Sequence, residues 1–146
     1  NWEALKLKEG KKTVLGGVPK GLPALVKAQR IQDKVAGVGF DWDTTDQVWD
    51  KVQEELREFQ EEIAKGDSNK SEEEFGDVLF SLINYARFLK INPDTALERT
   101  NQKFIQRFNY LETKAQEMGK TIGAMSLKEM EALWMESKNH SSSPGS

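Results

Sequence analysis

Acidic side chains gather in the middle of the chain, at spacings that could bind a metal ion. Between residues 54 and 77 there are ten acids and only three bases. Glu55 and Glu58 are three residues apart, and so are Glu74 and Asp77. Residues at this spacing lie on one face of a helix. On two neighbouring helices, the four carboxylates would form a cage of oxygen ligands, which suits Mg²⁺ or Mn²⁺.

The commoner explanation of such an acidic run is a solvated helix face. In the first acidic segment, however, Glu55, Glu58 and Glu62 border an apolar stripe, whereas Glu54 and Glu61 lie farther round the helix. The stripe consists of Val48, Val52, Leu56, Phe59 and Ile63. The run therefore divides into a set of acids that borders the stripe and a solvated set.

The second acidic segment lies on a helix that is apolar on two sides, because Phe80 and Phe88 face away from its main stripe. That stripe consists of Phe75, Val78, Leu79, Leu82, Ile83, Ala86 and Leu89. Between the two phenylalanines lies a polar wedge of Glu74, Asp77, Ser81 and Asn84, with Lys70 one turn ahead. Buried carboxylates need a partner, which is either a cationic side chain or a metal ion. A di-iron centre is excluded, because it requires histidines on these helices.

Positive and aromatic side chains follow on the later helices. Lys103 and Arg107 are one turn apart, and Asn101 projects from the apolar stripe beside them. Trp134 and Lys138 are one turn apart on the last helix. A substrate rich in phosphate oxygens needs both a metal and cations. The alternatives are surface salt bridges for the two cations of the fourth helix and core packing for the tryptophan.

Helix-capping signals and Gly/Pro breaks predict the elements that position these residues. Five helices are expected, over residues 23–36, 44–64, 71–90, 93–118 and 126–139. No strand alternation is present, so the predicted fold class is all-α, a helical bundle of about five helices. Residues 1–17 are expected to form a lead-in segment, residues 18–139 the helical domain, and residues 140–146 a flexible tail.

Composition excludes several classes of protein. The pI is near 5.3, which argues against nucleic-acid binding. No stretch is apolar enough to span a membrane. The chain has no cysteine, and its one histidine, His140, lies in the tail. A thiol nucleophile and a Ser-His-Asp triad are therefore excluded, and a cytoplasmic location is expected. Because the chain begins without Met, we expect it to be processed or part of a longer protein.

Five motifs in order resemble the all-α nucleoside triphosphate pyrophosphohydrolases, and most closely the C-terminal catalytic domain of MazG proteins. They are Gly21-Leu22-Pro23-Ala24-Leu25, Val38-Gly39-Phe40-Asp41-Trp42, Glu54-Glu55-Leu56-Arg57-Glu58 with Glu74-Phe75-Gly76-Asp77, Asn101-Gln102-Lys103-Phe104 with Arg107-Phe108, and Trp134 with Lys138. The resemblance covers roughly residues 18–138. MazG proteins typically carry two such domains in tandem, whereas this chain has one.

The resemblance implies hydrolysis of a nucleoside triphosphate to a monophosphate and pyrophosphate, with broad base specificity. It implies that Glu55, Glu58, Glu74 and Asp77 hold Mg²⁺. The positions that match the family's nucleotide contacts are Lys51, Glu54, Lys70, Lys103, Arg107, Trp134 and Lys138. Glu54 or Glu58 could be the base that activates water, a homodimer is implied, and nucleic acid and membrane are not expected partners. The alternatives are a non-catalytic interaction or nucleotide-sensing module and a relative restricted to dUTP or dCTP.

Overall fold

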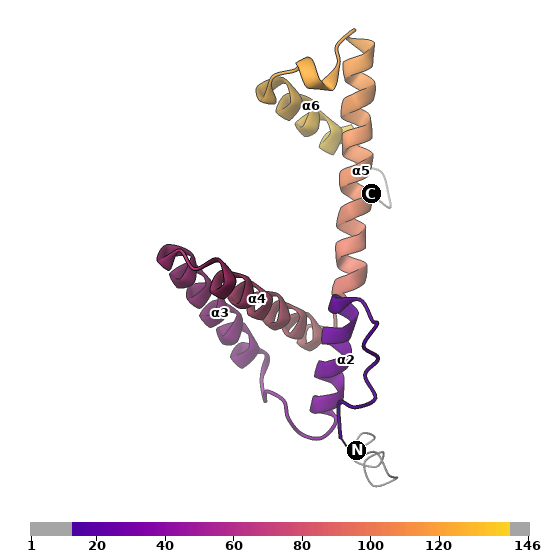
Figure 1. Cartoon of the computed structure of the whole chain (residues 1–146). Coiled ribbons are helices and arrows are strands. Elements are labelled where there is room, and N and C mark those ends of the chain that lie inside the picture. Colours follow the sequence, from indigo (N-terminus) through magenta and orange to yellow (C-terminus); the bar gives the residue numbers. More distant parts are fainter. Residues whose placement is uncertain (1–12, 141–146) are drawn as a thin grey trace. The chain divides into compact units, whose positions relative to one another are not determined.

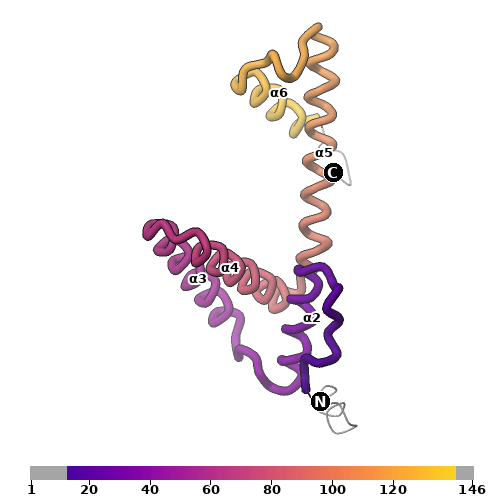
Figure 2. The backbone as a smooth tube through the Cα atoms, viewed as in Figure 1, coloured from indigo at the N-terminus to yellow at the C-terminus, as the bar shows by residue number. Residues whose placement is uncertain are grey.

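The computed structural model describes residues 13–140, in which all regular elements are helices (Figures 1 and 2). In chain order they are α2 (Ala24–Ala36), α3 (Thr45–Lys65), α4 (Ser68–Phe88), α5 (Pro93–Glu117), the short 3-10 helix η1 (Ile122–Ala124) and α6 (Leu127–His140). The predicted all-α class is confirmed. The expected tail residues 141–146 and residues 1–12 of the lead-in segment lie outside the described residues.

The chain divides into two compact units, Asn1–Asp94 and Thr95–Ser146, which are described separately below. The first contains α2, α3 and α4, and the second contains most of α5 together with η1 and α6. The prediction of one bundle built from all five helices therefore stays a prediction.

In the first unit, α3 and α4 form a helical hairpin and lie side by side (Figure 1). The turn between them uses Gly66, whose φ of 78° is a left-handed conformation that costs glycine nothing. Val48 and Val52 of α3 and Val78 of α4 are buried. Helix α2 also packs on α4, where the Gln32 side chain donates a hydrogen bond of 2.9 Å to the Phe80 carbonyl.

Capping side chains fix where these helices begin. Thr44 and Gln47 form a capping box at the start of α3, where the sequence predicts a helix over residues 44–64. The predicted start of α4 at Ser71 is wrong, because α4 begins at Ser68. The Asp67 side chain caps it by accepting the Lys70 N–H at 3.0 Å. A cap at Asp67 satisfies a free N–H group of the earlier first turn and adds almost one turn to the helix.

In the second unit, α6 folds back along the C-terminal part of α5. The rings of Phe104 and Trp134 are 4.8 Å apart, and the Tyr110 hydroxyl donates a 2.6 Å hydrogen bond to Glu136. Ser126 and Glu129 form a capping box at the start of α6, where the sequence predicts a helix over residues 126–139. These contacts position the face of α6 that carries Trp134.

The apolar stripes of α3 and α4 are only partly covered. Five of their large side chains are 41–53% exposed, namely Leu56, Ile63, Phe75, Leu79 and Leu82. Phe80, on the second apolar side of α4, is 43% exposed, so this side is also only partly covered in the single chain. Among residues 13–140, no helix is long and apolar enough to cross a membrane.

Candidate metal and nucleotide site

Three of the predicted acidic residues meet between α3 and α4. Glu55 and Glu58 from α3 and Glu74 from α4 each place a carboxylate oxygen within 4.8 Å of the other two. Glu55 is 7% exposed, and the other two are half-buried. We call these three residues the acid cluster. The i, i+3 spacing on α3 and the close packing of the hairpin together produce it.

The acid cluster has an unbalanced electrostatic environment. The Lys51 Nζ lies 2.9 Å from Glu55 and 3.7 Å from Glu54, and Glu55 raises the pKa of this lysine, chiefly through their hydrogen bond. Desolvation raises the pKa of Glu58, and the charges of Glu55, Glu54 and Glu74 raise it further. One lysine therefore faces several carboxylates, and a further positive charge would stabilise the cluster.

Two oxygens of the acid cluster are buried without a hydrogen-bond partner in the described part of the chain, namely Oε2 of Glu55 and Oε2 of Glu74. A buried acceptor without a partner costs stability, and more so when it is charged. A divalent cation takes several oxygen ligands, so it would satisfy both atoms. The donor set therefore fits a hard divalent cation, in agreement with the sequence prediction.

Asp77, the fourth predicted ligand, lies outside the acid cluster and is exposed. Its role as the fourth metal ligand therefore stays a prediction. Helical residues turn by about 100° each, so the buried Val78 lies well round the helix from Asp77. Asp77 is thus at the solvent edge of the hairpin, one turn beyond Glu74.

The other predicted residues of the first unit differ in their surroundings. Glu54 is half-buried beside Lys51, outside the acid cluster. Lys70 is exposed near the start of α4, where Glu73 is the main cause of its raised pKa. Asn84 lies farther along α4 and accepts two hydrogen bonds from Arg87.

The predicted residues of α5 and α6 all belong to the second unit. Lys103, Asn101 and Lys138 are exposed, Arg107 and Trp134 are half-buried, and the side chain of Asn101 donates to Glu98 at 3.3 Å. The ring contact between Phe104 and Trp134 packs Trp134 of α6 against α5. Because each unit is described by itself, the meeting of these residues with the acid cluster stays a prediction.

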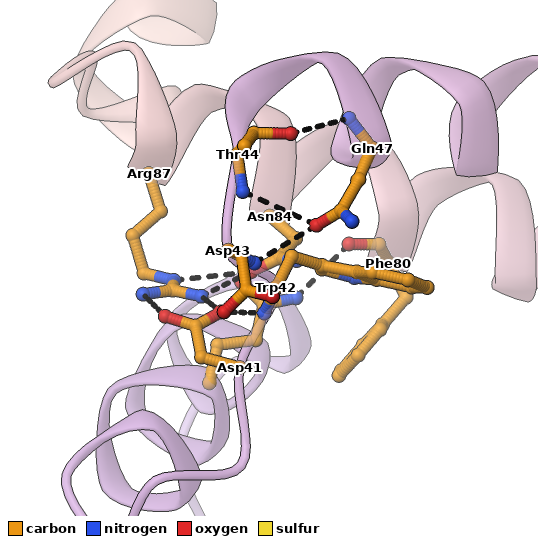
Figure 3. A network of polar contacts seen from close by, with 9 residues as sticks. Asp41, Trp42, Asp43, Thr44, Gln47, Phe80, Asn84 and Arg87 are labelled. Atoms are coloured by element: carbon orange, nitrogen blue, oxygen red, sulfur yellow. Dashed lines mark hydrogen bonds and ion pairs between the residues drawn. The ribbon is translucent and has the colours of Figure 1, made fainter.

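The sequence did not predict the ion pair between Asp41 and Arg87, which are 46 residues apart in the chain. Two guanidinium nitrogens donate to the Asp41 carboxylate at 3.1 and 2.6 Å (Figure 3). Each residue gave a weak signal, Asp41 inside a resemblance motif and Arg87 as a charge interrupting an apolar stretch. Neither signal identifies the partner.

The protein is thus an all-α protein with a carboxylate cluster between two adjacent helices. Residues 44–111 match the model of the MazG nucleotide pyrophosphohydrolase domain. These residues are therefore similar to that domain, and the resemblance predicted from the sequence is confirmed. The matched segment contains α3, α4 and much of α5, and so includes the acid cluster.

Relatives with similar sequences extend this finding. The chain is 39% identical to the nucleoside triphosphate pyrophosphohydrolase/pyrophosphatase MazG of Thermotoga maritima and 39% identical to the nucleoside triphosphate pyrophosphohydrolase of Escherichia coli K12. Each alignment covers 94% of this chain and 54% of the relative, so the chain spans about half of their length. The uncharacterized protein YabN of Bacillus subtilis is 46% identical over 94% of this chain and 29% of its own length.

Proposed function

We propose that the protein hydrolyses nucleoside triphosphates to nucleoside monophosphates and pyrophosphate, with Mg²⁺ bound at the acid cluster. The observation that carries this proposal is the meeting of Glu55, Glu58 and Glu74 within a domain matched to nucleotide pyrophosphohydrolases. The names of the relatives in Thermotoga maritima and Escherichia coli support the same reaction.

Glu55, Glu58 and Glu74 would hold the cation, and the exposed Asp77 would join them when substrate is bound. A divalent cation bound there supplies charge neutralisation for phosphate oxygens and lowers the pKa of water. Because Glu54 lies beside the acid cluster without belonging to it, Glu54 is the carboxylate left to accept the proton of the attacking water. This water attacks the α-phosphorus and breaks the bond between the α-phosphorus and the oxygen that bridges it to the β-phosphorus, so that pyrophosphate leaves.

Cationic side chains complete the proposed site. Lys103 and Arg107 are placed one turn apart on α5, where they would neutralise the charge that develops on pyrophosphate. Lys51, Lys70 and Lys138 would bind further phosphate oxygens, and Trp134 and Asn101 would contact the nucleoside. Each of these roles is part of the proposal.

A non-catalytic acidic docking face is the competing function. Such a face works through solvated charges, whereas Glu55 is 7% exposed and has an unpartnered buried oxygen in the described chain. The deciding experiment measures monophosphate and pyrophosphate formation from eight ribo- and deoxyribonucleoside triphosphates, with Mg²⁺ and then with EDTA. Metal-dependent formation of both products supports the proposal, and turnover of dUTP or dCTP alone restricts it. A folded protein that forms neither product refutes it.

We also propose that a second copy of the chain covers the exposed stripe of α3 and α4. Leu56, Phe75 and Leu79 are 41–48% exposed, and large neighbouring apolar side chains on a surface mark interaction sites. The proposed location is the cytoplasm, which agrees with the absence of cysteine. Sedimentation analysis of the wild type and of Leu79→Glu tests the homodimer. A wild type that stays monomeric at high concentration would exclude it.

A further inference from the structure

Helix α6 carries two side chains of the proposed site, Trp134 and Lys138, but it buries little apolar surface of its own. Among the residues of α6, all of which the structure describes, Ser137 is the one that is buried, at 1% exposure. Leu127 and Met135 are 68% and 59% exposed. Because hydrophobic burial is also non-directional, it does little to fix the rotation of this helix about its axis. Specific side-chain contacts with α5 therefore set the direction in which Trp134 and Lys138 point.

The Tyr110 side chain of α5 makes two contacts with α6. Its hydroxyl donates a 2.6 Å hydrogen bond to Glu136, and its ring centre lies 4.7 Å from that of His140. Glu136 and His140 are four residues apart, so they lie on one face of α6. The Lys114 ammonium lies 5.6 Å from the centre of the Tyr110 ring, a cation–π contact that holds the tyrosine from its own helix. Tyr110 thus binds one face of the last turn of α6.

A second contact with α5 holds α6 on its other flank. The ring centres of Trp134 and Phe104 are 4.8 Å apart. At about 100° per residue, Trp134 lies about 60° round the helix from the buried Ser137 in one direction, and His140 about 60° in the other. The two ring contacts therefore hold α6 from both flanks of its buried face.

Rotation of the helix couples these two flanks. Glu136 lies on the flank of His140, and Lys138 lies on the flank of Trp134. A rotation of α6 that breaks its contacts with the tyrosine therefore moves Trp134 and Lys138 together. The hydrogen bond to Glu136 raises the pKa of Tyr110 to about 12, so the tyrosine hydroxyl remains a donor at neutral pH.

We infer that Tyr110 is a positioning residue, which fixes the rotation of α6 through Glu136 and so directs Trp134 toward the nucleoside. Lys138 is directed in the same way, because it lies one turn from Trp134. This inference rests on the proposed function, in which Trp134 contacts the nucleoside and Lys138 binds a phosphate oxygen. Tyr110 itself acts through α6 and does not touch the substrate.

The first test follows the indole N–H signal of Trp134 by NMR in the full chain, in EDTA and without nucleotide. Tyr110→Phe keeps the aromatic ring and removes only the donor to Glu136. We expect the Trp134 signal to shift in this variant. Tyr85→Phe is the matched control, since Tyr85 is the other tyrosine of the chain and lies on α4, and this variant should leave the signal unchanged. An unchanged Trp134 signal in Tyr110→Phe would overturn the inference.

The second test measures the Kd of ATP in EDTA by NMR titration. We expect Tyr110→Phe to raise this Kd about threefold to tenfold, the effect of one lost hydrogen bond. Glu136→Gln keeps an acceptor oxygen for the tyrosine hydroxyl and should retain most of the affinity, whereas Glu136→Ala should lose as much as Tyr110→Phe. The double variant Tyr110→Phe/Glu136→Ala should lose no more than either single variant, because both remove the same contact.

Two results of this titration would contradict the inference. A lower Tm in Tyr110→Phe with an unchanged Kd would show that the tyrosine only stabilises the fold. Additive losses in the double variant would exclude action through Glu136. In the presence of Mg²⁺, KM should rise by the same factor as Kd with kcat little changed, and an unchanged KM would also contradict a positioning role.

These measurements separate the inference from the proposed function. If the wild type forms no monophosphate with Mg²⁺ but Tyr110→Phe weakens ATP binding in EDTA, the proposed reaction fails and the positioning role stands. If the wild type hydrolyses ATP and Tyr110→Phe keeps the wild-type Kd and KM, the positioning role alone fails. A wild type that binds no ATP, with or without Mg²⁺, would refute both.

Discussion

Replacing Glu55 by glutamine should remove metal-dependent stabilisation while leaving the metal-free protein almost as stable as the wild type. The substitution keeps the shape of the side chain and removes one charge. In the metal-free protein, that charge is repelled by two carboxylates with oxygens within 4.8 Å and attracted by Lys51 at 2.9 Å. Coulomb energy is inversely proportional to distance, so the attraction is at most about 1.7 times one repulsion. The two repulsions and the attraction therefore nearly cancel.

Magnesium changes this balance, because a ligand that binds only the folded state adds its binding free energy to stability. At a free Mg²⁺ concentration of 100 times Kd, the gain is about 2.7 kcal/mol. For a domain of this size, each kcal/mol raises Tm by roughly 2 to 4 °C. We therefore expect Mg²⁺ to raise the Tm of the wild type by roughly 5 to 10 °C, and to raise that of Glu55→Gln by much less.

The assay is thermal unfolding followed by circular dichroism, in EDTA and across a Mg²⁺ titration. Glu61→Gln is the matched control, since Glu61 is an exposed acid of the same helix whose partner is Arg57 at 3.9 Å. This control should keep the full Mg²⁺ response. An equal Mg²⁺ response in Glu55→Gln and the wild type would refute the metal site at the acid cluster, and so would a wild type that does not respond.

Three further predictions concern the helices that position the site. Asp67→Ala should lower the free energy of unfolding by about 1 kcal/mol in urea, whereas Ser71→Ala should change it by much less, because Asp67 is the cap. Gly66→Ala should cost about 1 to 2 kcal/mol in the same assay, since its φ is 78°. The hydrogen bond to Glu136 raises the pKa of Tyr110 to about 12. The contribution of this hydrogen bond to stability is therefore present below pH 10 and is lost as pH rises through 12. In Tyr110→Phe, the tyrosinate absorbance step near pH 12 should be absent.

Local signals predicted most of the helices, and tertiary context decided the rest. Two helices begin with a capping residue that is followed three residues later by glutamine or glutamate, namely Thr44 with Gln47 and Ser126 with Glu129. This spacing allows the two side chains to form a capping box. Asp67 lacks such a partner, because Lys70 is the third residue after it, whereas Ser71 has Glu74 at that position and so predicts a later helix start. Both choices satisfy helix chemistry, and the sequence alone does not distinguish them.

The candidate site could be predicted where it depends on spacing and not where it depends on long-range contacts. Glu55 and Glu58 meet Glu74 because helical periodicity places them on facing sides of one hairpin. Periodicity gave no equally sharp answer for Asp77, which is at the edge of that face. The Asp41–Arg87 pair joins a loop to a helix across 46 residues, and no local pattern specifies such a contact.

The α3–α4 hairpin buries charge and exposes apolar surface, which is the reverse of what stabilises an isolated pair of helices. Glu55 is 7% exposed, whereas Leu79 is 46% exposed. A bound cation would neutralise the buried charge, and a second copy of the chain would cover the exposed apolar surface. The two proposals therefore predict separable contributions to stability. The part due to a dimer grows with protein concentration in EDTA, while the part due to Mg²⁺ depends on the ion at fixed protein concentration. A Tm in EDTA that is independent of protein concentration would leave the exposed stripe without a second copy to explain it.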